Sequence, residues 1–172
     1  QIDEDWVLQL KALLDRPYVN NDQAYQLTLL GQYFASKGSW YLARYALEQA
    51  VAQNPEYSEA WALFGEAREQ TGGNGLPDFQ RAISIDPSSI TTHAMLGLYY
   101  REHNDPQKAF DHFQYLAAIQ TSNPVWQIEL GNTALALGSV EEAVKYMQNA
   151  IDLDPASSTA WKSLARLSYV YG

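Results

Sequence analysis

The chain has 172 residues, enough for one domain of ordinary size, and its 47% hydrophobic and 13% aromatic content exclude an intrinsically disordered chain. The formal net charge of −9 argues against a nucleic-acid-binding protein, because affinity for phosphate backbones depends on clustered Lys and Arg. No apolar run approaches the roughly 18 residues that a membrane helix needs, and no signal-peptide pattern opens the chain. The absence of cysteine excludes a disulfide framework and leaves the compartment open. Because the chain begins with Gln1, we expect a fragment or a processed product.

The first 20 residues predict an N-terminal helix over residues 3–15. Ile2, Trp6 and Leu10 share one helical face, and acidic residues crowd the first turn, where the helix dipole favours them. Arg16-Pro17 ends this helix, because the residue before Pro resists the α-helical conformation. Two interpretations stay open: the second helix of an upstream repeat, or an N-terminal cap.

A fixed period then organises the chain. Gly31, Gly65, Gly97 and Gly131 follow one another at intervals of 34, 32 and 34 residues, and Ala165 lies 34 residues further on. Within each period we expect two short amphipathic helices, separated in the first repeat by a break at residues 37–39. A recurring period of this length indicates a repeat protein, in which stacked repeats supply the core that no single repeat has.

Several positions recur in phase with these glycines. Large residues fill the gap to the next repeat, and small residues allow the two helices of a repeat to approach closely. The recurring positions include Leu27, Leu30, Phe34, Ala43, Leu47, Ala50 and Pro55, then Trp61, Phe64, Phe79, Ala82 and Pro87, then Leu96, Tyr100, Ala109 and Phe113, then Leu130, Ala143, Met147, Ala150 and Pro155, and finally Trp161 and Leu164. This pattern resembles the tetratricopeptide repeat (TPR) family.

The resemblance implies an all-α fold, a right-handed α-solenoid of antiparallel helix pairs with about four repeats plus a terminal helix. The repeats are expected at about residues 24–57, 58–89, 90–123 and 124–157, within residues 21–157. The N-terminal helix at residues 1–20 precedes them, and the first helix of a fifth repeat follows at residues 158–172.

Repeat two departs from the pattern. Gly72-Gly73-Asn74-Gly75 stands where the turn and the start of the second helix are expected, and each Gly costs a helix about 1 kcal/mol relative to Ala. We therefore expect the helix to resume only near Pro77, which suits a first turn. A hinge or ligand-facing loop is one explanation; a drifted repeat with a shorter second helix is the favoured one.

Helix starts are predicted from capping residues. Asp105-Pro106 starts the second helix of repeat three, and Asn123-Pro124 starts repeat four. Ser139 and Glu142 form a predicted capping box at the next helix.

The last helix is expected to leave Leu164, Leu167 and Tyr171 without a covering helix. Terminal repeats usually have a polar outer face. Either the natural chain continues past Gly172, or this edge pairs with another copy of the chain.

The sequence contains no recognisable catalytic or metal-binding pattern. His93, His103 and His112 lack metal-ligand spacing, there is no Cys, and no His-Glu-x-x-His motif occurs. His93 stands at a core position of the repeat, so we expect a buried or half-buried side chain. The sequence therefore predicts a non-enzymatic protein with no cofactor and no metal.

A concave surface is the binding site that the resemblance implies. In TPR proteins the second, fifth, ninth and twelfth residues of each repeat, all on its first helix, line this surface; they are here called the groove positions, and their spacing puts them on one helical face. The surface is acidic in repeat two, aliphatic in repeats three and four, and basic in the last helix. The candidate contact residues are Glu59, Glu66, Glu69, Leu98, Arg101, Val125, Ile128, Asn132, Leu135, Lys162 and Arg166.

We expect this surface to bind an extended or helical peptide from a protein partner. Aliphatic side chains that face water often mark a binding surface, although a tight superhelix or residues 3–15 would also cover them. Leu98, Ile128 and Leu135 are the expected apolar anchors, and Asn132 is expected to hydrogen-bond the peptide backbone. A basic end of the peptide would face the acidic residues of repeat two, and an acidic end the basic residues of the last helix.

Residue identity argues against one known TPR function. Members that bind chaperone tails clamp a terminal carboxylate with Lys and Asn from the first repeat and Lys and Arg from the third. Here Thr28, Gln32, Thr91 and Met95 stand at those positions. The sequence therefore argues against a clamp for chaperone tails.

Two other functions stay open. The chain would serve mainly to self-associate, as a homodimer through its terminal helices, or it would be a docking or regulatory segment of a larger enzyme. No nucleic acid and no membrane insertion are expected of this segment.

Overall fold

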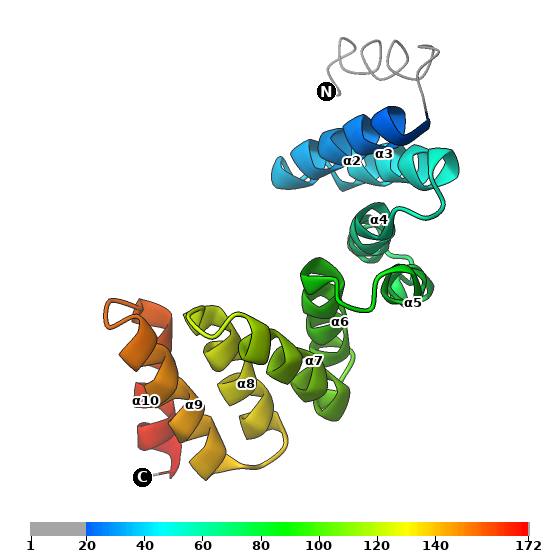
Figure 1. Cartoon of the computed structure of the whole chain (residues 1–172). Helices are drawn as coiled ribbons and strands as arrows, with labels where there is room; N and C mark the ends of the chain where they lie inside the picture. Colours follow the sequence, from blue (N-terminus) through cyan, green and yellow to red (C-terminus); the bar gives the residue numbers. More distant parts are fainter. Residues whose placement is uncertain (1–19, 172) are drawn as a thin grey trace. The chain divides into compact units, whose positions relative to one another are not determined.

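The computed structural model describes residues 20–171, and every regular element in that range is an α-helix (Figure 1). The predicted helix at residues 3–15 lies outside the described residues. The helices are α2 (Asn20–Ser36), α3 (Trp40–Gln53), α4 (Ser58–Gln70), α5 (Leu76–Ile85), α6 (Ile90–Glu102), α7 (Pro106–Ile119), α8 (Pro124–Ala136), α9 (Val140–Leu153) and α10 (Ser158–Tyr171). They group into two compact units, one that ends at Thr92 and one that begins at His93.

Turns between paired helices recur at one position of the repeat. Gly38 has a φ of 71° and Gly138 a φ of 83°, in the left-handed region that glycine enters without a steric cost. In repeat three the same position is Asn104, with a φ of 61°. The predicted break at residues 37–39 is confirmed, since α2 ends at Ser36 and α3 begins at Trp40.

The period glycines are sites of close approach between paired helices. A Cβ atom on Gly31 would lie 2.5 Å from Leu47 Cγ, and one on Gly97 would lie 2.6 Å from Phe113 Cε1. The large residues on the second helices are 2% exposed or less, which confirms their predicted place in the core. Each helix pair packs through one glycine and one large side chain. The residues that define the repeat period are therefore also residues of the core.

Two of the three predicted helix starts carry the expected side-chain caps. The Lys108 N–H donates to Asp105 at 3.3 Å, and the Val125 N–H donates to Asn123 at 3.1 Å. Ser139 precedes α9 as predicted, but its side chain makes no capping hydrogen bond, so the predicted capping box does not form. Helix α9 therefore begins directly after the turn at Ser139 without a side-chain cap.

Repeat two has a shorter second helix, as predicted. Helix α5 has 10 residues, whereas α3, α7 and α9 have 14 each. The helix resumes at Leu76, next to the predicted Pro77. A Cβ atom on Gly75 would lie 2.3 Å from the Gly65 carbonyl oxygen, so the glycine turn packs directly on α4. This packing agrees with a drifted repeat.

The prediction that α10 exposes Leu167 is wrong. Leu167 is 3% exposed and packs in the core cluster with Met147 and Ile151, and Leu164 packs partly buried against the same cluster. The error arose because the helix face that meets α9 was taken for the face that meets the next repeat. Tyr171, the third predicted residue, is 57% exposed.

Candidate peptide-binding surface

In the unit that ends at Thr92, a hydrogen bond links the groove positions of α2 and α4. Gln32 Nε2 donates to Glu59 Oε1 at 3.3 Å, and the Tyr57 hydroxyl donates to Glu59 Oε2 at 3.2 Å. Burial raises the pKa of Tyr57 to about 12, and the Glu59 carboxylate adds to the shift. Tyr57 therefore stays protonated at neutral pH and holds the Glu59 carboxylate at the junction of repeats one and two.

The other two acidic candidates differ in their surroundings. The Glu69 carboxylate accepts a hydrogen bond from the backbone N–H of Gly75, so it holds the turn that leads into α5. Glu66 lies half-buried on α4. Sequence spacing did not reveal the role of Glu69 in the turn, because that turn is specific to repeat two.

A hollow of about 500 Å³ lies beside Glu59. Its lining is rich in carboxylates and hydroxyls, namely those of Glu56, Tyr57, Glu59, Asp86, Ser88, Ser89 and Thr91. Because carboxylates and hydroxyls accept hydrogen bonds, such a lining suits the cationic end of a Lys or Arg side chain. Sequence reasoning missed this hollow, since six of its ten lining residues lie where α5 ends and α6 begins, between Ile85 and Thr91.

In the unit that begins at His93, the aliphatic candidates are covered to different degrees. Val125 is 48% exposed on the first turn of α8, whereas Ile128 is 9% exposed and belongs to the core cluster of Met147 and Leu167. Leu98 and Leu135 are partly buried against core clusters. The expectation that Ile128 faces water is wrong, because the fifth position of α8 turns toward the next repeat. Val125 is the aliphatic candidate with the most exposed surface.

Two polar candidates on α6 and α8 have contrasting roles. The Arg101 guanidinium pairs with the Glu129 carboxylate, which joins the first helices of repeats three and four. Asn132 is half-buried, and its side-chain amide makes no hydrogen bond with any residue between 20 and 171. Its donor and acceptor therefore have no partner in that range, and the predicted bond to a peptide backbone stays a prediction.

The basic candidates Lys162 and Arg166 are exposed on α10. They lie four residues apart, so they share one face of the helix. No ion pair links either of them to another described residue. In an acidic chain, two neighbouring cations without an acidic partner favour contact with an acidic ligand.

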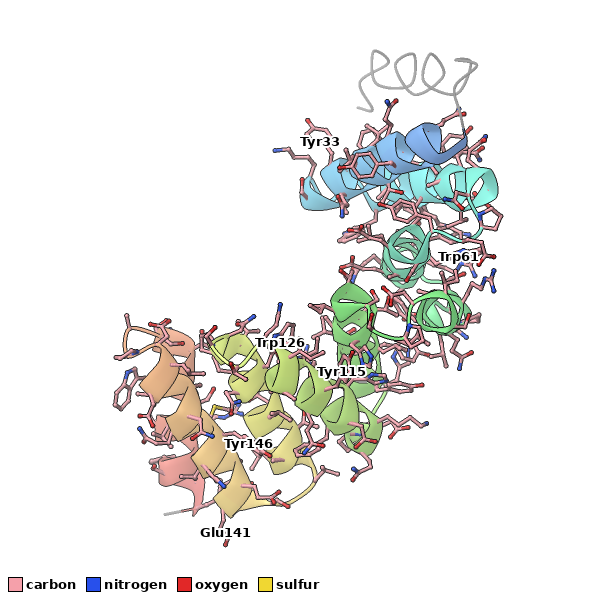
Figure 2. All side chains as sticks on the ribbon, in the orientation of Figure 1. Tyr33, Trp61, Tyr115, Trp126, Glu141 and Tyr146 are labelled. Atoms are coloured by element: carbon pink, nitrogen blue, oxygen red, sulfur yellow. The ribbon has the colours of Figure 1, made fainter. Side chains whose placement is uncertain are left out.

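A histidine pair in repeat three was not predicted. His93 Nδ1 lies 3.0 Å from His112 Nδ1, and the His93 ring stacks on Tyr115 with ring centroids 3.8 Å apart. His93 is half-buried, as predicted, and Tyr115 is labelled in Figure 2. The repeat register could have indicated this pair, because His112 directly precedes the core residue Phe113 and His93 lies one turn before Gly97.

Between residues 20 and 171, no three His, Cys, Asp or Glu side chains are grouped to hold a metal ion. In the same range, no helix is long and apolar enough to cross a membrane.

Comparison with known proteins identifies the repeat. Residues 100–168 match the family model described as tetratricopeptide repeat. No curated protein sequence shows significant similarity to the chain.

Solved structures share the fold at low identity. TTC0263 of Thermus thermophilus, described as a thermophilic TPR protein, has 18% identity over 84% of this chain and 80% of its own, with a TM-score of 0.72. PilF of Pseudomonas aeruginosa has 16% identity over 87% of this chain and 69% of its own, with a TM-score of 0.79. MamA of Desulfovibrio magneticus has 18% identity over 85% of this chain and 84% of its own, with a TM-score of 0.76.

The helix pairs and these similarities define an all-α solenoid of stacked helix hairpins. The resemblance to the tetratricopeptide repeat family is confirmed by the match at residues 100–168, and the solved structures show the same fold over 84–87% of the chain. Proteins of this family are generally non-catalytic scaffolds that bind other proteins.

Proposed function

We propose that the chain is a non-enzymatic interaction module that binds a peptide segment of a partner protein on its first-helix faces. The observation that carries this proposal is Asn132, a half-buried residue of α8 whose side-chain amide has no hydrogen-bond partner between residues 20 and 171. A polar group in such a place gains most from a ligand that supplies the missing bonds, because a partly buried amide loses hydration. A peptide backbone offers both a donor and an acceptor.

The apolar contact on this face comes from Val125 rather than Ile128. Val125 lies two turns before Asn132 on α8 and exposes 48% of its surface, so a peptide side chain gains by covering it. Ile128 contributes only indirectly, because it packs in the core cluster behind this face of α8. A charged substitution at Ile128 would therefore test the stability of the fold instead of binding.

The unit that ends at Thr92 contributes a preference for basic side chains. The hollow beside Glu59 holds a cationic group against a carboxylate that Gln32 and Tyr57 keep in place. Such a preorganised acceptor gives affinity at a low entropic cost. A ligand of this module is therefore a peptide with at least one Lys or Arg.

The test is selection of peptides from a random displayed library on the intact chain, followed by calorimetric titration of the selected peptides. Glu59→Lys is expected to weaken binding of basic peptides at least tenfold, because it replaces the carboxylate held in place beside the hollow with a cation. Glu48→Lys is the matched control, since Glu48 is exposed on α3, away from this face.

The α8 face needs its own variant. The double variant Val125→Asp, Asn132→Ala is expected to weaken binding at least tenfold, and Val144→Asp on the exposed side of α9 is its control. Binding that stays within twofold in both test variants would remove the first-helix faces from the proposal. A chain that selects no peptide and sediments as a dimer would favour the self-association alternative.

A further inference from the structure

The histidine pair of repeat three, His93 and His112, brings two imidazole nitrogens to one point. His93 Nδ1 on α6 and His112 Nδ1 on α7 lie 3.0 Å apart, although 19 residues separate them in the sequence. Their spacing along the chain argues against a metal site, but the fold places the two rings together. Two nitrogens that reach the same point are the first requirement of a site for a transition-metal ion.

Aromatic neighbours hold both rings of the pair in place. The His93 ring stacks on Tyr115 with planes 17° apart, and the His112 ring stacks on Tyr100 with planes 8° apart. The planes of the two imidazoles meet at 63°. Because neighbouring side chains already fix these orientations, an ion that binds between the rings orders little else.

The distance between the two nitrogens indicates which ion fits. Two nitrogens bound to one ion at about 2.0–2.1 Å lie about 2.9 Å apart when the bonds meet at about 90°, and about 3.3–3.4 Å apart at the tetrahedral angle. The observed 3.0 Å is close to the first value. Cu²⁺ and Ni²⁺, which adopt square-planar or tetragonal geometry, therefore fit better than tetrahedral Zn²⁺, and Cu²⁺ has the highest intrinsic affinity for such ligands.

The surroundings of the pair leave room for further ligands. Both residues are half-buried, so part of each remains in contact with solvent. Between residues 20 and 171, no group of three His, Cys, Asp or Glu side chains surrounds such a point, so an ion held here keeps coordination positions for water. The Asp111 carboxylate acts electrostatically on His112 and offsets part of the charge of an ion.

A hydrogen bond within the pair is the metal-free form of the same arrangement. At 3.0 Å one Nδ1 donates its proton to the other, because a neutral imidazole nitrogen is either a donor or an acceptor. When an ion binds, the donor ring moves its proton from Nδ1 to Nε2, and both Nδ1 lone pairs then coordinate the ion. The pair neither gains nor loses a proton in this exchange.

We propose that His93 and His112 form a site for one divalent transition-metal ion, with Cu²⁺ bound most tightly and Ni²⁺ bound more tightly than Zn²⁺. The ion joins α6 to α7 through one side chain from each helix, and water fills its remaining positions. This site is separate from the peptide-binding function proposed above, because neither histidine stands at a groove position.

The test is calorimetric titration of the intact, metal-free chain with the chloride salts of Cu²⁺, Ni²⁺ and Zn²⁺ at pH 7. The tightest class of sites is expected to hold one ion per chain, with Ni²⁺ bound at least threefold more tightly than Zn²⁺. Electron paramagnetic resonance of the chain with one equivalent of Cu²⁺ is expected to show hyperfine coupling to two imidazole nitrogens.

Variants assign the binding to the pair. His93→Phe and His112→Phe keep an aromatic ring in each stack, and each is expected to weaken Ni²⁺ binding at least tenfold. His103→Phe is the matched control and is expected to stay within twofold, because His103 is exposed and its ring stacks on Tyr99 with centroids 3.9 Å apart. Circular dichroism of each variant checks that its helices are intact.

Binding at the pair is also expected to raise stability, because the unfolded chain does not hold the two rings together. Saturating Ni²⁺ should raise the midpoint temperature of unfolding for the parent and for His103→Phe. The same addition should leave the midpoints of His93→Phe and His112→Phe unchanged. The double variant Val125→Asp, Asn132→Ala is expected to bind Ni²⁺ as the parent does, so failure of the groove proposal is distinguishable from failure of this one.

Three results would overturn the proposal. The first is a parent chain that binds Ni²⁺ no more tightly than the double variant His93→Phe, His112→Phe, which would leave the pair a hydrogen-bonded contact only. The second is an equal loss of affinity in all three single variants, which would assign the ion to scattered surface histidines. The third is a Cu²⁺ spectrum of the parent without coupling to two nitrogens, a result that does not depend on how any variant folds.

Discussion

Repeats two and three fill one pair of positions with different chemistry. The positions lie three residues after the core glycine and one residue before the large core side chain. In repeat two they hold Arg68 and Asp78, with Nη1 3.1 Å from Oδ2. In repeat three they hold Tyr100 and His112, whose rings stack with centroids 5.7 Å apart and planes 8° apart. One space between paired helices therefore accepts an ion pair or a pair of stacked rings.

The two remaining repeats show what this space needs. Repeat one fills it with Phe34 and Ala46, and repeat four with Ala134 and Tyr146, so one large and one small residue suffice. The ion pair of repeat two is less well satisfied, because Arg68 Nε is buried and makes no hydrogen bond with a described residue. All four repeats thus need side chains that fill this space. The polar groups that repeats two and three place there make different interactions, an ion pair in one repeat and stacked rings in the other.

The largest expected effect comes from giving repeat two the residues of repeat one. The double variant Arg68→Phe, Asp78→Ala is expected to raise the free energy of unfolding at pH 7 by about 1–4 kcal/mol, because apolar replacement of a buried ion pair removes its desolvation cost. Urea unfolding followed by circular dichroism measures the change. Arg68→Phe alone is the contrast: it leaves the Asp78 carboxylate unpaired and is expected to destabilise by roughly 3–5 kcal/mol. A double variant less stable than the parent would show that the ion pair is worth more than its burial costs.

The ring pair of repeat three is expected to weaken in acid. Burial lowers the pKa of His112 to about 4, and the charge of neighbouring His93 lowers it further against the opposing effect of Asp111. A lowered folded-state pKa gives stability that is present above the unfolded value near 6.5 and is lost as the pH falls toward 4.

Between pH 7 and pH 5 this loss is about 2 kcal/mol. His112→Tyr, which copies Tyr146 of repeat four (Figure 2), is expected to remove that part of the pH dependence. Urea unfolding at both pH values measures it, with the exposed His103→Gln as control. A His112 Cε1 proton that titrates near 6.5 in the folded chain would contradict the prediction.

The ion pair of repeat two is expected to respond in the opposite direction, with a smaller effect. Burial raises the pKa of Asp78 to about 6, although the charges of Arg68 and Arg44 act against the shift. A raised folded-state pKa gives stability that is present below the unfolded value of 3.8 and is lost as the pH rises through 6.

From pH 5 to pH 7 the cost at Asp78 is about 1 kcal/mol. Asp78→Asn is therefore expected to gain stability relative to the parent as the pH rises over this range, and to differ least at the acidic end. Thermal unfolding of parent and variant across the range measures the difference. A constant difference between the two proteins would mean that Asp78 does not titrate there.

The repeats could be predicted from the sequence because the packing that holds each helix pair together recurs with a fixed period. Each core glycine needs a large partner on the next helix, so pairs such as Gly97 and Phe113 recur with the period and are readable from spacing. The Arg68–Asp78 pair was not predicted, because a two-residue deletion lies between its members and hides their register. The exposure of Ile128 was predicted wrongly for another reason: a groove position defines a helix face, but the stacking of the next repeat decides how much of that face meets water. The role of the groove positions in binding stays a prediction.

The smallest expected effect lies in the turns that join the paired helices. Repeat two has Gly72 at the left-handed position with a φ of 82°, and its N–H donates to the Glu69 carbonyl at 3.0 Å. Repeat three has Asn104 there with a φ of 61°, and its N–H donates to the Arg101 carbonyl at 3.4 Å. Asn tolerates this conformation better than other side chains do, but only glycine avoids the steric cost entirely.

Asn104→Gly is therefore expected to stabilise the chain by about 0.5 kcal/mol, because relief of the left-handed strain exceeds the added entropy of the unfolded state. Gly72→Asn is expected to destabilise it by a similar amount, and urea unfolding of both variants at pH 7 measures the pair. Opposite signs for the two substitutions would show that one turn geometry serves both repeats. If Asn104→Gly instead destabilises, the Asn104 side chain holds the turn of repeat three, and repeats two and three differ in their turns as well as in their cores.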